Sequence, residues 1–207
     1  MTLKRWLALC GVAATVLVAL AFTVVGGSTP DDKAGSAEVL TFYRDHKTAQ
    51  LVAALMVVIA AVLFVMFGAR LRDALRGTGA GDGLLPAVAF GGTIVLASGL
   101  LFMAMVHFAL VQAADHKFAV AAQTLNVLDN NDFFGLVGGI AIVMLSGGLA
   151  TVRAPVLPRW LGWAAIVFGI LCLAGPLGFF GFLLGALWLL VVSIMLTVRK
   201  DEAAVAA

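Results

Sequence analysis

The sequence predicts an all-α fold: a polytopic membrane protein built as a six-helix transmembrane bundle with both termini in the cytoplasm. Hydrophobic residues make up 63% of its 207 residues and charged residues only 12%, whereas a soluble domain is nearer half apolar and a quarter charged. The apolar residues form long runs, and a helix of about 20 such residues crosses about 30 Å of hydrocarbon. Lysine and arginine gather between alternate runs, as they do in multi-span proteins. This composition excludes a soluble enzyme, a coiled coil and a disordered tail.

The whole chain, residues 1–207, is expected to form one integral membrane domain. Its spans are expected at residues 6–25, 49–69, 85–111, 133–152, 160–174 and 177–198. The first run is longer than the core of about 7–15 apolar residues in a signal peptide, so we interpret it as an uncleaved span. A single helix over residues 160–198 would be about 58 Å long. We therefore divide that run at Gly175 and Pro176, which favour a turn.

The basic residues predict the orientation of these spans. One set of connections holds nine of them: Lys4, Arg5, Arg70, Arg72, Arg76, Arg153, Arg159, Arg199 and Lys200. The other set holds four: Lys33, Arg44, Lys47 and Lys117. The positive-inside rule assigns the larger set to the cytoplasm, which places both termini there.

The two outer connections are expected to be partly helical. Ser36 is expected to cap a helix that continues through Tyr43 straight into the second span. Residues 118–128 form an amphipathic stretch that we expect to lie at the membrane interface. The acidic and amide residues 129–132 are expected to cap the fourth span. A calcium loop is the alternative, but Phe133 stands where a further ligand is required.

Small and basic residues predict how the bundle packs and what it contacts. Two pairs of glycines spaced four apart, Gly135 with Gly139 and Gly181 with Gly185, favour close helix approach inside the bundle first and dimerisation second. The inner loop opens with Arg70, Arg72 and Arg76, which we expect to pair with anionic lipid headgroups; a protein or nucleotide partner is the alternative. A membrane protein or a second copy is a further expected partner. Nucleic acid is not, because the formal net charge is only +2.

His107 is the one ionisable side chain inside the expected spans besides two thiols. Pumps and proton-coupled carriers usually carry intramembrane acids or bases, so their absence argues against both classes, while a facilitator with a neutral pathway remains open. The sequence has no His-Glu-x-x-His, no Cys-x-x-Cys and no phosphate-binding loop. We predict no catalytic residue and no cofactor, and the missing motifs argue against an enzyme.

A cluster of polar residues is expected at the outer side of the second and third spans. Its candidate ligand-binding residues are His107, Asp115, His46 and Arg44. Asp115 is expected about 12 Å above His107 and about 80° around the same helix. Histidine and carboxylate suit zinc or similar ions, so His107, Asp115 and His46 are a candidate metal site. The favoured interpretation is structural, with a neutral His107 that hydrogen-bonds to a neighbouring span.

Four stretches resemble a known group of proteins. They are residues 42–46 (FYRDH), 125–134 (LNVLDNNDFF), 157–163 (LPRWLGW) and 178–196. Similar stretches occur in small bacterial six-span integral membrane proteins of unknown function. The resemblance covers most of the chain and implies a six-span fold in a bacterial membrane. It implies no activity and no catalytic residue.

Two functions follow as expectations. The dry, uncharged interior favours a non-enzymatic scaffold, partner subunit or sensor in the bacterial plasma membrane. The alternative is a small-ligand or metal-binding protein, or a facilitator, that uses an extracytoplasmic pocket around His107, Asp115 and His46.

Overall fold

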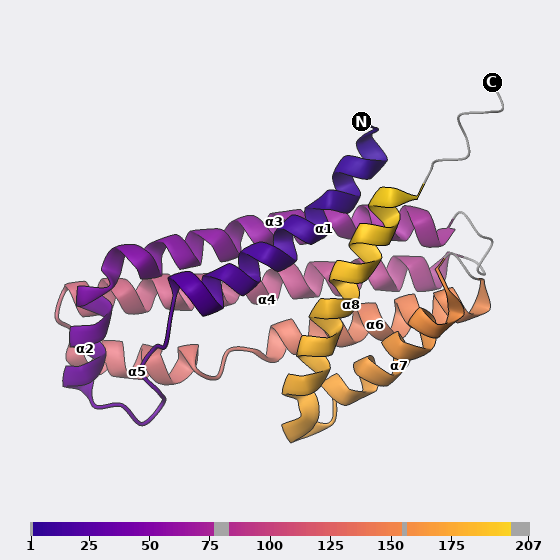
Figure 1. Cartoon of the computed structure of the whole chain (residues 1–207). Helices are drawn as coiled ribbons and strands as arrows, with labels where there is room; N and C mark the ends of the chain where they lie inside the picture. Colours follow the sequence, from indigo (N-terminus) through magenta and orange to yellow (C-terminus); the bar gives the residue numbers. More distant parts are fainter. Residues whose placement is uncertain (1, 77–82, 155–156, 200–207) are drawn as a thin grey trace.

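The computed structural model describes residues 2–76, 83–154 and 157–199, and these form an all-α protein (Figure 1). Its elements are α1 (Leu3–Leu20), the π-helical turn η1 (Ala21–Val25), α2 (Ser36–Asp45), α3 (Lys47–Arg76), α4 (Leu84–Asp115), α5 (Ala119–Asp129), α6 (Phe134–Arg153), α7 (Arg159–Cys172), the 3₁₀ turn η2 (Gly175–Leu177) and α8 (Gly178–Val198). Five helical segments are long and apolar enough to cross a membrane: Leu3–Val25, Lys47–Arg76, Leu84–Asp115, Ala119–Arg153 and Gly178–Val198. The prediction of a multi-span helical membrane protein is confirmed.

The fifth expected span, residues 160–174, has nearly the expected bounds, but its helix is short for a complete crossing. It is present as α7, but α7 has 14 residues and is therefore about 21 Å long, less than the hydrocarbon thickness of about 30 Å. The chain turns where the sequence indicated, because Gly175 adopts a φ of 59° that favours glycine. Figure 1 shows this turn partway along the bundle, far from α2 and α5.

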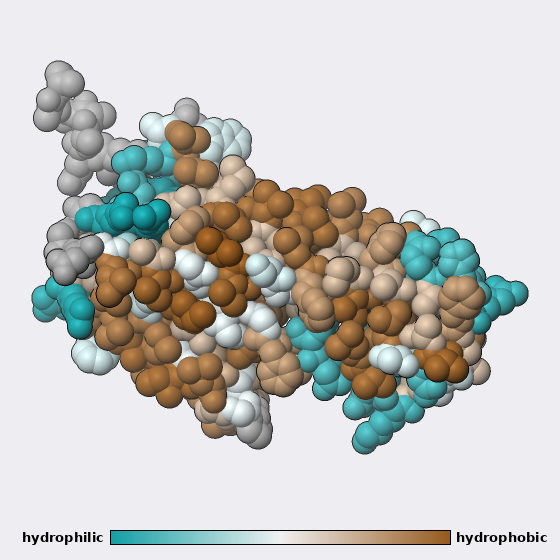
Figure 2. Space-filling view, turned by 180° about the vertical axis from the view of Figure 1, so that it is seen from behind, coloured by the Kyte–Doolittle hydropathy of each residue, from teal (hydrophilic) through white to brown (hydrophobic). Residues whose placement is uncertain are grey.

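Helices α3 and α4 are longer than a membrane requires. They contain 30 and 32 residues, or about 45 and 48 Å of helix. Helix α4 packs between α3 and α6, and the three form a layer (Figure 1). Helices α2 and α5 cover only one end of this layer, which we call the α2/α5 end. Figure 2 shows hydrophilic residues gathered at both ends of the molecule, with an apolar region between them. The overhanging helix ends therefore lie outside the apolar region.

The α2/α5 end has a small hydrophobic core of its own. Val39 and Tyr43 of α2 and Ala122 of α5 are fully buried against Leu110 and Val111 of α4. The long bundle core is separate and draws on the longer helices. The second core explains why α2 and α5 pack onto the end of α4.

Two local expectations differ from the structure here. The chain turns at His46, so α2 does not continue straight into α3. Helix α2 begins at Ser36, but its N-cap residue is Gly35 and no side chain caps it. Helix α5 buries Ala122 and Asn126 against protein, while Val120 is 80% exposed. The apolar residues of α5 are therefore divided between this small core and the exposed surface.

Glycines hold the long helices close together. A Cβ atom on Gly135 would lie 2.9 Å from the Cα of Gly99, so the backbones of α6 and α4 touch there. A Cβ on Gly139 would overlap the backbone of Leu96, and one on Gly181 would overlap the backbone of Cys172 in α7. A Cβ on Gly185 would lie 2.5 Å from the Cγ2 atom of Ile140 in α6. Close approach inside the bundle is confirmed for both predicted glycine pairs.

Candidate functional site: a cavity beside His107

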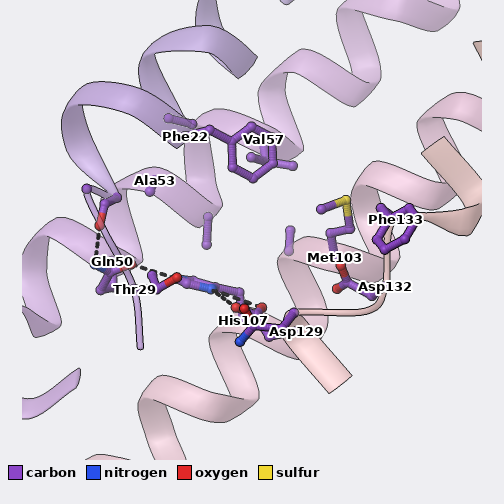
Figure 3. A pocket seen from close by; sticks show the side chains of 16 residues that line it. Phe22, Thr29, Gln50, Ala53, Val57, Met103, His107, Asp129, Asp132 and Phe133 are labelled. Atoms are coloured by element: carbon purple, nitrogen blue, oxygen red, sulfur yellow. Dashed lines mark hydrogen bonds and ion pairs between the residues drawn. The ribbon is translucent and has the colours of Figure 1, made fainter. Parts of the chain in front are cut away.

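A cavity of about 310 Å³ lies at the α2/α5 end, between η1, α3, α4 and the turn that joins α5 to α6 (Figure 3). Its apolar side comes mainly from α3 and α4: Ala53, Ala54, Val57, Met103 and Ala104. Its polar side comes from the α2/α5 end: Gln50, His107, Asp129, Asn130 and Asp132. The cavity is therefore amphipathic.

The loop that follows η1 forms one wall of the cavity. Asn126 of α5 donates a hydrogen bond to the carbonyl of Asp31 at 2.7 Å, and Asn130 donates to the carbonyl of Pro30 at 3.1 Å. These bonds join the loop to α5. They place Gly26, Gly27 and Thr29 along the cavity.

Gln50 links three elements on the polar side. Its side chain is 1% exposed; Nε2 donates to the carbonyl of Gly26 at 2.8 Å, and Oε1 lies 2.8 Å from Nε2 of His107. The Gly26 carbonyl can only accept, so the amide nitrogen of Gln50 must face it and the amide oxygen must face His107. Nε2 of His107 therefore carries a hydrogen and donates it to Gln50.

Asp129 holds the other side of the His107 ring. Both carboxylate oxygens of Asp129 lie 3.1 Å from Nδ1 of His107, and the ring of Tyr43 packs edge-on against the imidazole at 5.7 Å. One proton must lie between Nδ1 and the carboxylate, because two facing lone pairs would repel each other. The pair is either imidazolium with carboxylate or neutral imidazole with carboxylic acid. In both states its net charge is zero.

Asp132 differs from Asp129 because it has no such partner. Its residue is 7% exposed, and both carboxylate oxygens are buried without a hydrogen-bond partner among the described residues. Helix α6 has 20 residues and is therefore about 30 Å long, which is enough to cross the hydrocarbon. The turn that holds Asp132 precedes α6 and so lies outside that membrane-spanning helix. Burial, and then the nearby Asp129, raise the pKa of Asp132 to about 7.

The predicted capping role of residues 129–132 is wrong. The N-cap residue of α6 is Phe133, and no side chain caps this helix. Asp129 bonds to His107 instead, while Asn131 donates to the carbonyl of Val127 at 2.8 Å. A part-buried histidine without a hydrogen-bond partner costs more free energy than a helix end whose N–H groups water can bind. Asp129 therefore bonds to His107 and does not cap α6.

The structure does not bring together the three residues of the expected ligand or metal site. His46 is exposed, stacks on Phe42 and contacts its carbonyl through Nδ1 at 2.9 Å. Asp115 forms an exposed ion pair with Lys47 at 2.7 Å. His107 does line a cavity, but neither Asp115 nor His46 lines it. Arg44, the fourth candidate, is exposed on α2. Within residues 2–76, 83–154 and 157–199, no group of three or more His, Cys, Asp or Glu residues is arranged to hold a metal ion.

The three arginines expected at lipid headgroups occupy different environments. Arg70 is buried and pairs with Asp73 at 3.2 Å, so its guanidinium belongs to the protein interior. Arg72 lies over the ring of Phe90 at 5.7 Å. Arg76 is exposed at the end of α3 and is the best placed of the three for a headgroup.

Sequence reasoning identified His107 but missed Gln50, Asp129 and Asp132 as its neighbours. Gln50 carried a usable signal, because it is a lone amide within an apolar run. Asp129 and Asp132 looked like ordinary capping residues, and their separation from His107 along the chain hid the contact. No protein-family model, curated protein or solved structure matches the chain. The resemblance to bacterial six-span proteins stays a prediction.

Proposed function

We propose that this protein is a non-enzymatic small-ligand-binding protein of the bacterial plasma membrane, a sensor or binding subunit that uses the cavity beside His107. The observation that carries the proposal is the cavity itself, of about 310 Å³. Ligand sites in proteins typically have volumes of about 300–1,000 Å³, with mostly apolar walls and a few fixed polar groups. The hydrogen-bonded row Gly26, Gln50, His107 and Asp129 supplies those fixed groups.

The proposed orientation puts the cavity on the extracytoplasmic side and both termini in the cytoplasm. The start of α1 and the end of α3 lie far from α2 and α5 (Figure 1), and these helix ends carry Lys4, Arg72 and Arg76. The positive-inside rule favours the cytoplasm for these helix ends. A ligand would then arrive from outside the cell.

We propose that α7 and α8 form a hairpin that enters and leaves from the cytoplasmic side. Helix α7 is about 21 Å long, and the residues around its turn are apolar and exposed, with Leu173 at 65% and Phe179 at 63%. Such side chains favour hydrocarbon over water. A hairpin of this kind still returns the C-terminus to the cytoplasm, so the orientation does not depend on a sixth complete crossing.

The test is a thermal-shift screen of small polar and amphipathic compounds with the purified protein in mild detergent. Ala53→Leu fills the cavity, because Ala53 lines it and is 6% exposed. Ala69→Leu is the matched control, with the same change on an exposed position of α3. We expect at least one compound to raise the melting temperature of the parent and of Ala69→Leu but not of Ala53→Leu. Equal shifts in all three proteins, or no shift in any, would contradict the proposal.

A further inference from the structure

The cavity contains one acidic group that no described residue neutralises. The His107–Asp129 pair has zero net charge in either protonation state, as its hydrogen bonds require. Asp132 stands beside it with both oxygens buried and unpartnered among the described residues. The described residues that line the cavity include no lysine and no arginine. When Asp132 is ionised, the cavity therefore holds a single uncompensated negative charge.

A buried carboxylate without a partner is costly, and proteins usually pair or neutralise such a charge. Asp132 is not needed to cap α6, whose N-cap is Phe133. It is not part of the His107 network, in which Asp129 already occupies Nδ1. Since the described part of the chain offers no partner, a group from outside the chain would stabilise the ionised form.

Resting on the proposed function, we propose that the ligand is a small monocationic amine with an apolar group, whose ammonium contacts the carboxylate of Asp132. The ammonium donates hydrogen bonds, and Asp132 accepts them. The apolar group lies along the methyl-rich wall that Ala53, Val57 and Ala104 form. Figure 3 shows Asp132 next to Met103, at the junction of the polar and apolar sides.

Charge and size narrow the ligand class further. An anion would face the carboxylate of Asp132 in a poorly solvated site, where like charges repel strongly. A bare metal ion needs several oxygen, nitrogen or sulfur ligands, and the described residues offer no group of three or more such acids, histidines or cysteines. A cavity of about 310 Å³ is at the small end of the usual range for ligand sites. A compact amine fits these conditions.

The experiment compares three probes that share one hydrocarbon chain: hexylamine, 1-hexanol and hexanoate. Binding to the full chain in mild detergent is measured by equilibrium dialysis at about pH 8, with protein-free micelles as the blank for partition into detergent. Hexylamine is protonated there, because its amine ionises like that of lysine, near pH 10. Asp132→Asn removes the charge with almost no change of shape. Asp45→Asn is the matched control, because Asp45 is exposed on α2 and does not line the cavity.

We expect saturable binding of hexylamine, and binding of hexanol and hexanoate that is weaker by roughly thirtyfold or more, the loss typical of an unpaired buried charge. Asp132→Asn is expected to weaken hexylamine binding by the same factor and to leave hexanol binding unchanged. Asp45→Asn is expected to bind all three probes as the parent does.

Tight binding of hexanol or hexanoate to the parent would overturn the amine inference, and that comparison needs no variant to fold. The cavity would then still bind a small molecule, so the proposed function would stand. A second outcome would also overturn the amine inference alone. In it, none of the three probes binds, but the thermal-shift screen yields a compound that stabilises the parent and not Ala53→Leu. Failure of the three probes together with failure of the whole screen would overturn both.

Discussion

Gln50 and His107 are joined by a hydrogen bond of 2.8 Å that connects α3 to α4 at the wall of the cavity. The same amide donates to Gly26, at the end of the first helical segment. One buried side chain thus fixes the positions of three segments and the direction in which the imidazole faces Asp129.

Gln50→Leu should destabilise the folded protein. It would leave the Nε2 hydrogen of His107 and the carbonyl of Gly26 without their partner, and a stranded buried polar group costs about 1–3 kcal/mol. The free energy of unfolding in mixed detergent micelles measures the loss. Gln123→Leu makes the same change on an exposed position of α5 and should alter stability little. Equal effects of the two substitutions would contradict the role assigned to Gln50.

Asp132→Asn should stabilise the ligand-free protein, and the gain should depend on pH. The pKa of Asp132 is raised from 3.8 to about 7, so the folded state holds this proton more tightly than the unfolded state. Its contribution to stability is complete below about pH 4 and is lost as the pH rises to about 7. Parent and variant should therefore melt at similar temperatures near pH 4, and the variant should melt higher at pH 8.

Melting curves of both proteins between those pH values check this prediction. His107 of α4 and Asp129 of α5, the titratable groups that face Asp132 in the cavity, are the same in both proteins. Asp45→Asn is the control and should follow the parent throughout. If the melting temperatures of the parent and Asp132→Asn differed by the same amount at every pH, Asp132 would not be a buried carboxylate that ionises in this range.

Leu173→Cys should be protected from reagents outside the cell. Leu173 follows α7, is 65% exposed on the protein surface, and belongs to the hairpin turn that we assign to the apolar layer. In a background where Cys10 and Cys172 are serine, a membrane-impermeant maleimide added to intact cells should not modify it. Gln123→Cys, on the exposed side of α5, should react. Detergent should make both thiols reactive, and labelling of Leu173→Cys from outside would instead show a complete crossing.

Gly139→Ala and Gly138→Ala should have opposite effects although the residues are neighbours. A Cβ on Gly139 would overlap the backbone of Leu96, while one on Gly138 would meet no atom within 4 Å. Overpacking of this kind costs about 1–3 kcal/mol, whereas alanine in an open helical position gains up to about 1 kcal/mol over glycine. The free energies of unfolding of the two variants, measured in mixed micelles, distinguish these two effects. Similar stability of both variants would show that α4 and α6 are not in backbone contact.

The sequence predicted the helices well because span length and apolar composition are local properties. Residues 49–69 were expected to be helical, and α3 extends this segment to Lys47–Arg76 because a helix continues past the hydrocarbon when its flanking residues permit. The break at His46 was missed, since it depends on Tyr43 packing against α4. Capping rules use only residues that are neighbours in the sequence, so they cannot predict that contact.

The site was only partly predictable for the same reason. His107 stood out as a lone ionisable residue in an apolar run, and it does lie in the cavity. Its partner Asp129 was assigned to a helix cap, because a short polar residue before a span usually serves there. The distance between His107 and Asp129 depends on how α5 folds back over α4. Asp115 and His46 were expected at the same outer side as His107, but exposed contacts with Lys47 and Phe42 hold them elsewhere.

The backbone contact between Gly99 and Gly135 has a consequence for selectivity. Gly135 follows Asp132 by three residues, and Gly99 precedes His107 by eight, or about two turns of α4. A Cβ atom on either glycine would meet the backbone of the other helix at less than 3 Å, so this contact fixes how closely α4 and α6 approach each other. A methyl group at either glycine would push α4 and α6 apart, although neither glycine lines the cavity. If the cavity binds a ligand as we propose, the fit of that ligand depends on a helix contact outside the lining of the cavity.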